Sequence, residues 1–128
     1  MDTLNNDILN VLEKYFPKPW NEERNGTRIG KKIYIQYGDK FDWPTLESDN
    51  INENVFCYGL RDQIGILSDG TVVPCCLDSN GDIPLGNIFE DNMENILNSQ
   101  KAQNIYNGFS NRTACEELCK RCSFVRKF

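Results

Sequence analysis

Six cysteines lie between residues 57 and 122 of this 128-residue chain, and no other sequence feature constrains its chemistry as strongly. They are Cys57, Cys75, Cys76, Cys115, Cys119 and Cys122. The chain has no histidine, which excludes Ser-His-Asp catalysis and metal sites built from imidazole. The thiols are therefore the only unusual chemical groups in the sequence.

Disulfide bonds are one use for six cysteines, and metal binding is another. Two Asn-X-Thr sequences, at Asn25 and Asn111, fit a secreted protein, but an asparagine-rich chain contains such sequences by chance. The N-terminus lacks the basic start and apolar run of a signal peptide, so we expect a cytoplasmic protein. In that reducing compartment, clustered thiols bind metals or do redox work. A disulfide-stapled domain is kept as an alternative.

Charge and hydropathy exclude two classes of partner. The 19 Asp and Glu residues outnumber the 14 Lys and Arg residues, which gives a net charge of −5. Binders of nucleic acid or of anionic membranes need clustered cations, so we expect neither partner. No segment approaches the roughly 20 consecutive apolar residues of a membrane span.

The first half of the chain predicts a helix followed by a strand. Apolar residues recur on one helical face over residues 3–16, and Pro17 ends the run. These residues are Leu4, Ile8, Val11, Leu12 and Tyr15. The polar stretch 17–30 is predicted to be a loop, and residues 31–37 alternate as a strand does. One helix and one strand cannot close a core, so we expect this strand to join a hairpin further along or a second copy of the chain.

The second half predicts a hairpin and helices, which makes the fold class α+β. Residues 63–67 and 71–74 flank a Ser-Asp-Gly turn, and Asp-Gly supplies the positive φ of a tight hairpin. Apolar residues then repeat at helical spacing over residues 91–108, with a break expected at Asn98 and Ser99. We expect two domains, residues 1–54 and residues 55–128.

Residues 119–122, Cys-Lys-Arg-Cys, form a C-x₂-C pair, in which a tight turn aims two thiolates at one metal centre. A thioredoxin-type redox pair precedes a helix in a βαβ context, whereas this pair lies near the C-terminus. A four-thiolate site needs two more ligands from Cys57, Cys75, Cys76 and Cys115. Neighbouring residues of an extended chain point to opposite sides, so Cys75 and Cys76 are not expected to bind the same metal.

The spacing Cys-x₃-Cys-x₂-Cys over residues 115–122 is also that of the motif that holds the catalytic cluster of radical S-adenosylmethionine enzymes. We do not assign it to that motif. Arg121 stands where that motif often has an aromatic residue. Only six residues follow Cys122, too few for the barrel that normally follows the motif.

A longer pattern resembles the SPASM/twitch domain, the C-terminal auxiliary iron–sulfur domain of many radical S-adenosylmethionine enzymes. The family pattern is Cys, a hairpin carrying Asp-Gly-x-Val-x-Pro-Cys-Cys-x-Asp, then Gly-Asn-Ile, a helix ending near Asn-Ser, and Cys-x₂-Cys. This chain has the same parts in the same order: Cys57, Asp69 to Asp78, Gly86 to Ile88, Asn98-Ser99, and Cys119-x₂-Cys122. The match covers about residues 55–124.

The resemblance implies that a small β-hairpin and helices surround one [4Fe–4S] cluster. Its ligands would be Cys57, Cys75, Cys119 and Cys122. Cys76 would be a packed thiol, and Cys115 would either replace one ligand or be a spare. Asp78 and Asn87 would hold loops around the site. A structural Cys₄ zinc module with the same four ligands is the alternative.

The resemblance also implies a role and partners. In the family such a cluster passes electrons, shapes the substrate pocket or docks a peptide, so a peptide or protein substrate is one expected partner. The other is a radical S-adenosylmethionine catalytic barrel, in cis or in trans, because residues 1–54 resemble only the last helix–strand unit of a partial TIM-type barrel. We do not expect this chain alone to cleave S-adenosylmethionine.

Four basic residues lie close to the predicted ligands in this acidic chain: Lys120, Arg121, Arg126 and Lys127. One interpretation is a solvated basic tail. The other is partial compensation of the negative charge that a thiolate-bound cluster carries. The sequence leaves both open.

Overall fold

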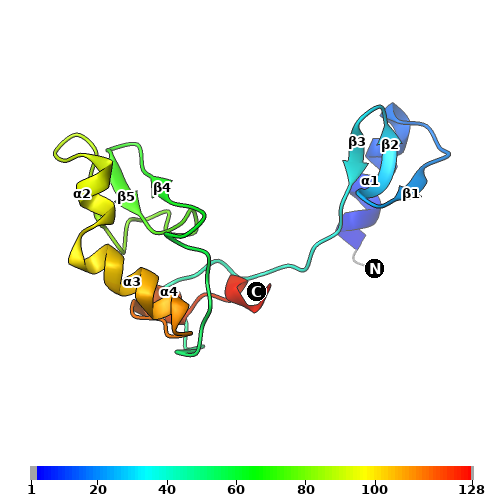
Figure 1. The fold of residues 1–128 in the computed structure, drawn as a ribbon. Coiled ribbons are helices and arrows are strands. Elements are labelled where there is room, and N and C mark those ends of the chain that lie inside the picture. The colour runs from blue at the N-terminus through cyan, green and yellow to red at the C-terminus, as the bar shows by residue number, and fades with distance from the viewer. Residues whose placement is uncertain (1–2, 128) are drawn as a thin grey trace. The chain divides into compact units, whose positions relative to one another are not determined.

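The computed structural model of the protein describes residues 3–127, and it describes side chains from residue 5 to residue 126. The chain divides into two compact units, here called unit 1 (residues 1–40) and unit 2 (residues 41–128), which are drawn in Figure 1. The predicted boundary between residues 54 and 55 therefore lies inside unit 2. No described helix is long and apolar enough to span a membrane.

Unit 1 consists of one helix and a three-stranded antiparallel sheet in the order β1-β2-β3. The elements are α1 (Thr3–Tyr15), β1 (Asn21–Glu23), β2 (Gly26–Gly30) and β3 (Ile33–Ile35). The predicted helix over residues 3–16 is confirmed, although the side chain of Leu4 lies outside the described side chains. Gly26 begins β2 with φ of 113°, and a side chain there would clash with the backbone oxygen of Ile35.

The prediction of a loop over residues 17–30 is wrong, because β1 and β2 lie within it. The residues of β1 are all exposed and those of β2 are at most half-buried, so neither strand shows the apolar alternation that identifies a strand in a sequence. Polar side chains bridge the two strands: Arg28 pairs with Glu23 at 3.2 Å, and Thr27 donates to Glu22 at 2.7 Å.

The strand predicted over residues 31–37 forms as the shorter β3, and its partner is β2. The expectation that it would join the hairpin of unit 2 is therefore wrong, while pairing with a second copy of the chain stays a prediction. That expectation depended on residues 17–30 being a loop. Because β2 runs antiparallel to β3, unit 1 supplies its own sheet neighbour.

The sheet of unit 2 is the predicted hairpin with a third short strand beside it. β4 (Gly65–Ile66) pairs with β5 (Thr71–Val73), and β6 (Gly86–Asn87) pairs with the other edge of β5; both pairs are antiparallel. The hairpin turn has the expected chemistry: an Asp69 oxygen accepts from the Thr71 N–H at 3.0 Å, and Gly70 has φ of 85°. β6 is too short to be recognised by alternation.

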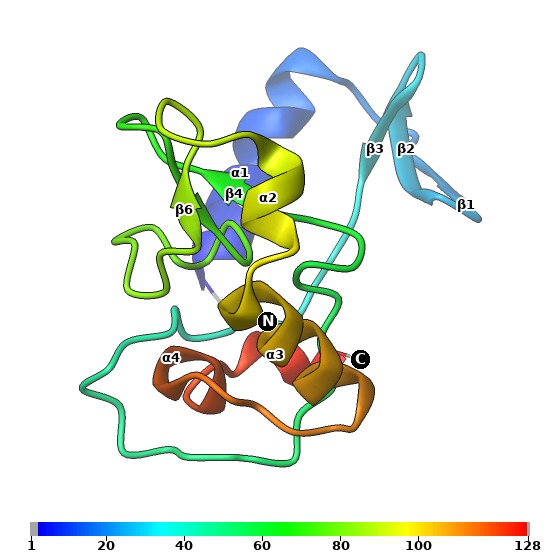
Figure 2. The same ribbon diagram turned by 60° about the vertical axis from the view of Figure 1, so that its left-hand side comes forward.

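The helices of unit 2 follow the sheet in sequence. They are α2 (Met93–Leu97), α3 (Gln100–Ser110) and α4 (Glu117–Lys120), and a 3₁₀ helix, η1 (Phe124–Lys127), comes last. The predicted helical stretch and its break are confirmed, and Figure 2 shows the bend between α2 and α3. Asn92 and Ser99 cap the two helices, each accepting a backbone N–H through its side chain.

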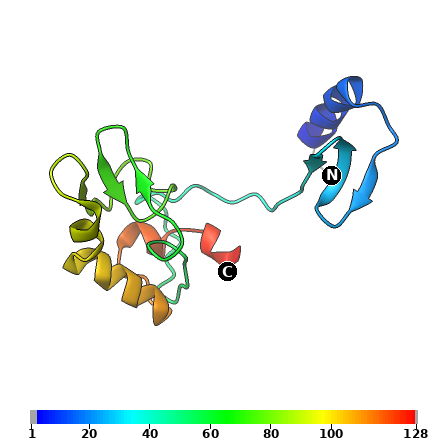
Figure 3. The same cartoon turned by 45° about the horizontal axis from the view of Figure 1, so that its top comes forward.

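In unit 2 the hairpin lies beside the helices (Figure 3), and an apolar core joins them. Its buried members are Val55, Val72, Ile83, Leu85, Ile96, Ala102, Ile105, Phe109, Ala114 and Leu118. Cys57 and Cys119 pack against this core. Unit 1 has no counterpart, because none of the described side chains of residues 5–40 is buried.

Candidate metal centre

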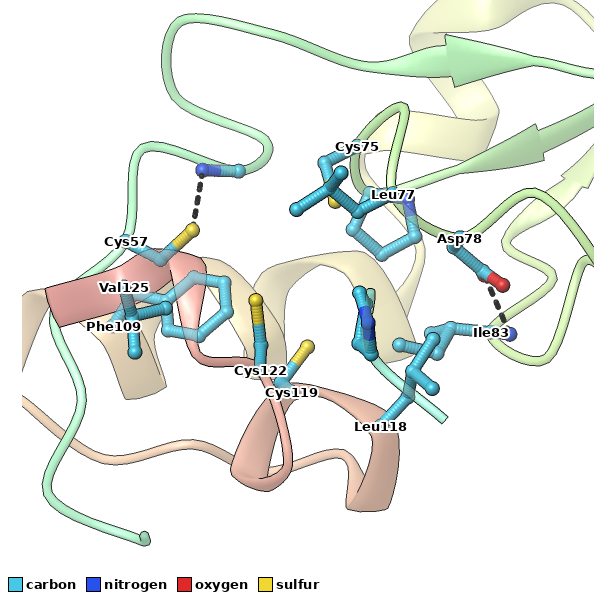
Figure 4. A pocket seen from close by; sticks show the side chains of 13 residues that line it. Cys57, Cys75, Leu77, Asp78, Ile83, Phe109, Leu118, Cys119, Cys122 and Val125 are labelled. Carbon is cyan, nitrogen blue, oxygen red and sulfur yellow. Dashed lines mark hydrogen bonds between the residues drawn. The ribbon is translucent and has the colours of Figure 1, made fainter. Parts of the chain in front are cut away.

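Four of the six cysteines line one pocket in unit 2, and Figure 4 shows their side chains around a common space. They are the four predicted ligands, Cys57, Cys75, Cys119 and Cys122. Most of the other lining residues are apolar, including Pro44, Ile83, Phe109, Leu118 and Val125. No three Cys, Asp or Glu residues of the described chain are grouped closely enough to hold a single metal ion.

Three segments bring these thiols to the pocket. Cys57 lies in the irregular stretch before β4, and Cys75 comes two residues after β5. The chain turns sharply there, since the Asp78 N–H donates to the Cys75 carbonyl at 3.3 Å. Cys119 is in α4, and Cys122 follows the helix in a turn closed by its N–H on the Cys119 carbonyl at 3.3 Å. The C-x₂-C spacing thus places two thiols on one side of the pocket.

Backbone N–H groups face three of the four sulfurs. The Gly59 N–H donates to Cys57 Sγ at 3.4 Å. The residues two and three positions after Cys75 and after Cys122 face those sulfurs in the same way, and their N–H groups lower the pKa of each thiol. Because such bonds favour the charged thiolate, the form that binds metal, the local turns prepare these cysteines as ligands.

Burial acts in the opposite direction and outweighs the N–H groups. Burial raises the pKa of Cys75 to about 11, and it also raises the pKa of Cys57 and of Cys122. Burial raises the pKa of Cys119 well above its usual range, and the charges of the other three thiols add to this effect. The free thiols are therefore neutral near physiological pH. A metal must displace their protons, so its binding strengthens as the pH rises.

Asp78 is the one carboxylate in the pocket lining, and it is 2% exposed. Its two oxygens accept hydrogen bonds from the N–H groups of Asp82 and Ile83, both at 2.8 Å. Asn87 likewise donates to the Asp69 carbonyl at 2.9 Å and accepts from the Phe89 N–H at 2.9 Å. The prediction that both residues hold loops is confirmed, but of the two only Asp78 lines the pocket.

The other two cysteines do not line the pocket. Cys76 is exposed, so the prediction that it is a packed thiol is wrong. Its neighbour Cys75 takes the inward side of the chain, which leaves the outward side to Cys76. Cys115 is also exposed, and its Sγ donates to the Asn104 carbonyl at 3.4 Å.

The basic residues of the C-x₂-C turn have contacts that the sequence does not reveal. The side chains of Lys120 and Arg121 are only 18% and 16% exposed, and they pair with Glu117 at 2.8 Å and 2.5 Å. The interpretation as a solvated tail is therefore wrong for these two. Arg126 is exposed, and the side chain of Lys127 lies outside the described side chains. The spacing of Glu117 from Lys120 and Arg121, three and four residues, could have predicted these ion pairs from the sequence, because residues so spaced are neighbours on a helix.

Comparison with known proteins points to the same segment. A family model described as SPASM, an iron–sulfur cluster-binding domain, matches residues 57–123. The matched stretch is more than half of the chain and includes all four pocket cysteines. No curated protein and no solved structure matches the chain significantly.

Proposed function

Because the chain belongs to the SPASM family of iron–sulfur cluster-binding domains, we propose that its four pocket thiols together hold one [4Fe–4S] cluster. The observation that carries the proposal is the convergence of Cys57, Cys75, Cys119 and Cys122 on one pocket within the matched region. Four thiolates are the usual ligand set of such a cluster. The two remaining cysteines are too few for a second set.

The chemistry of the pocket supports this assignment. The donor set is entirely sulfur, since the two oxygens of Asp78 are occupied by backbone N–H groups. Apolar walls limit water near the site, and N–H groups directed at the sulfurs raise the reduction potential of an iron–sulfur cluster. A bound cluster supplies one-electron chemistry there.

We further propose that the domain serves a radical S-adenosylmethionine enzyme in the cytoplasm, because SPASM domains are typical of such enzymes. Its role would be electron transfer or the positioning of a substrate such as a peptide. The partner would be a catalytic barrel in cis or in trans. Support for this partner comes from unit 2 alone, because the antiparallel sheet of unit 1 lacks the parallel neighbour that a barrel strand has.

Iron and sulfide analysis of the full chain, reconstituted anaerobically, tests the cofactor. We expect about four iron and about four sulfide per chain. Zinc without sulfide would support the structural Cys₄ module instead. Neither metal, together with the absence of free thiols, would support the disulfide-stapled alternative.

A pair of neighbouring substitutions tests the ligand assignment. Cys75→Ser is expected to abolish most iron binding, since it removes a sulfur that lines the pocket. Cys76→Ser is the matched control and is expected to retain the wild-type iron content, because Cys76 is exposed outside the pocket. The opposite result would exchange the roles of these two cysteines.

A further inference from the structure

The turn that carries Cys119 and Cys122 is held by a segment outside the family match. This segment, residues 41–53, is called the strap here; it precedes the matched region, which begins at residue 57. The strap has no helix or strand, yet it bonds to residues that follow it by 73 and 81 positions. These distant contacts fix the irregular backbone of the strap against the residues of the Cys119–Cys122 turn.

Ser123 ties the strap to the residue that directly follows Cys122. Its hydroxyl accepts a hydrogen bond from the Asp42 N–H at 3.1 Å and donates one to the Asp42 carbonyl at 3.0 Å. The aromatic rings of Phe41 and Phe124 meet edge to face beside this pair, with centroids 4.9 Å apart. One end of the strap is thereby fixed to the end of the ligand turn.

Arg121 ties the strap to the middle of the same turn. Its Nε donates to the Ser48 carbonyl at 2.9 Å, while its Nη1 donates to the carbonyl and the carboxylate of Glu117. Because one rigid guanidinium bridges the strap and α4, it restricts how the turn can rotate. The Asn52 N–H adds a bond to the Lys120 carbonyl at 2.8 Å.

The strap also forms part of the pocket wall. Pro44 is buried and lines the same pocket as the four thiols. A segment that contacts the ligand turn from outside therefore also contributes to the space that the sulfurs surround.

We propose that the strap stabilises the metal centre by holding the Cys119–Cys122 turn in place. Arg121 and Ser123 are the positioning residues that hold the turn against the strap. This inference rests on the proposed function for the nature of the group that is held. The contacts between the strap and the turn do not depend on that group. Without these contacts the turn is free to move, and a bound cluster is lost faster.

The test uses the full chain with Ser123→Ala and Arg121→Ala. Ser123→Ala is the more informative variant, because it breaks the bonds to Asp42 without changing the charge. Loaded protein is mixed with an iron chelator, and the rate of iron release is followed. We expect release to be about tenfold faster in each variant, the effect of losing one or two hydrogen bonds that hold a ligand turn. The Fe–S(Cys) vibrations should also shift.

Two controls separate this role from general loss of stability. Ser110→Ala removes one serine hydroxyl bond to a backbone carbonyl, at Tyr106, and Ser99→Ala removes the cap of α3. Neither residue lies in the strap or the pocket lining, so iron release and Fe–S(Cys) vibrations should stay at wild-type values. Wild-type release rates and vibrations in both Ser123→Ala and Arg121→Ala would overturn the inference.

Hydrogen exchange of the metal-free protein distinguishes failure of the inference from failure of the proposed function. The Asn52 amide should be protected in the wild type and exchange faster in Arg121→Ala, while the core amide of Ile105 exchanges at the same rate in both metal-free proteins. That result in a protein that binds no iron would contradict the proposed cluster binding but support the proposed contact between the strap and the ligand turn. Equal exchange of Asn52 in both proteins would overturn the inference that Arg121 holds the turn against the strap, whatever the iron content.

Discussion

The two compact units have similar secondary structure and very different interiors. Each has a three-stranded antiparallel sheet and at least one helix. Unit 2 buries a continuous apolar core, whereas no described side chain of residues 5–40 is buried in unit 1. Ile83, Phe109 and Leu118 belong both to the core of unit 2 and to the wall of its thiol pocket. In unit 2, therefore, the core and the thiol pocket have these three side chains in common.

The shared wall predicts that the metal and the fold of unit 2 depend on each other. Removing the metal with a chelator is expected to lower the melting temperature of unit 2 by roughly 12 °C or more, which corresponds to about 3 kcal/mol in a domain of this size. Amide exchange should accelerate in residues 57–123 and stay unchanged in residues 3–35. Unchanged exchange in both units after metal removal would show that unit 2 is stable without its metal.

A matched pair of isoleucine truncations compares the interiors directly. Ile105→Ala removes a side chain that is 1% exposed in α3, and it is expected to cost about 2–5 kcal/mol of unfolding free energy. Ile8→Ala removes one that is 51% exposed in α1, and the expected cost is below about 0.5 kcal/mol. Denaturant unfolding of the two variants measures both. Equal costs would mean that α1 is covered in solution.

The same contrast explains what the sequence predicts and what it does not. Apolar periodicity identifies α1, α2 and α3, and the Asp69-Gly70 pair identifies the hairpin, because these elements carry their own local signal. The four pocket cysteines follow from a family resemblance. The strands β1 and β2 are missed, because polar bonds such as Arg28–Glu23 leave no periodic apolar pattern.

The strap is missed for another reason. Ser48 and Asp42 use their backbone groups to reach Arg121 and Ser123, and a backbone carbonyl looks the same at every position of a sequence. Such contacts appear only when residues more than 70 positions apart are placed in space. The amino-acid composition of the strap, residues 41–53, does not indicate them.

The thiols also predict a pH dependence that is restricted to unit 2. Burial raises the pKa of Cys75 to about 11 in the metal-free fold, whereas a thiol of the unfolded chain has a pKa of about 8.5. The fold thus favours the neutral thiol, and this stabilisation is complete below about pH 8.5 and lost as the pH rises toward about 11. We expect metal-free unit 2 to lose stability across this range.

Urea unfolding of the metal-free protein at several pH values measures that loss. Cys75→Ser should reduce the pH dependence, because serine does not ionise in this range. Cys76→Ser should leave it unchanged, because Cys76 is exposed and lies outside the pocket. A pH dependence that is identical in both variants would contradict the role assigned to burial.

The smallest expected effect concerns the polar bonds of unit 1. Arg28→Ala removes the ion pair with Glu23, in which the two side chains are 47% and 37% exposed. Exposed pairs contribute little because water competes for both charges, so we expect a loss below about 1 kcal/mol, measured as faster exchange of the β1–β2 amides at low salt. High salt should remove most of the difference, since it screens the pair in the wild type. A larger loss that persists at high salt would mean that Arg28 supports the sheet through packing of its aliphatic stem, and that the interior of unit 1 is less open than its exposed side chains indicate.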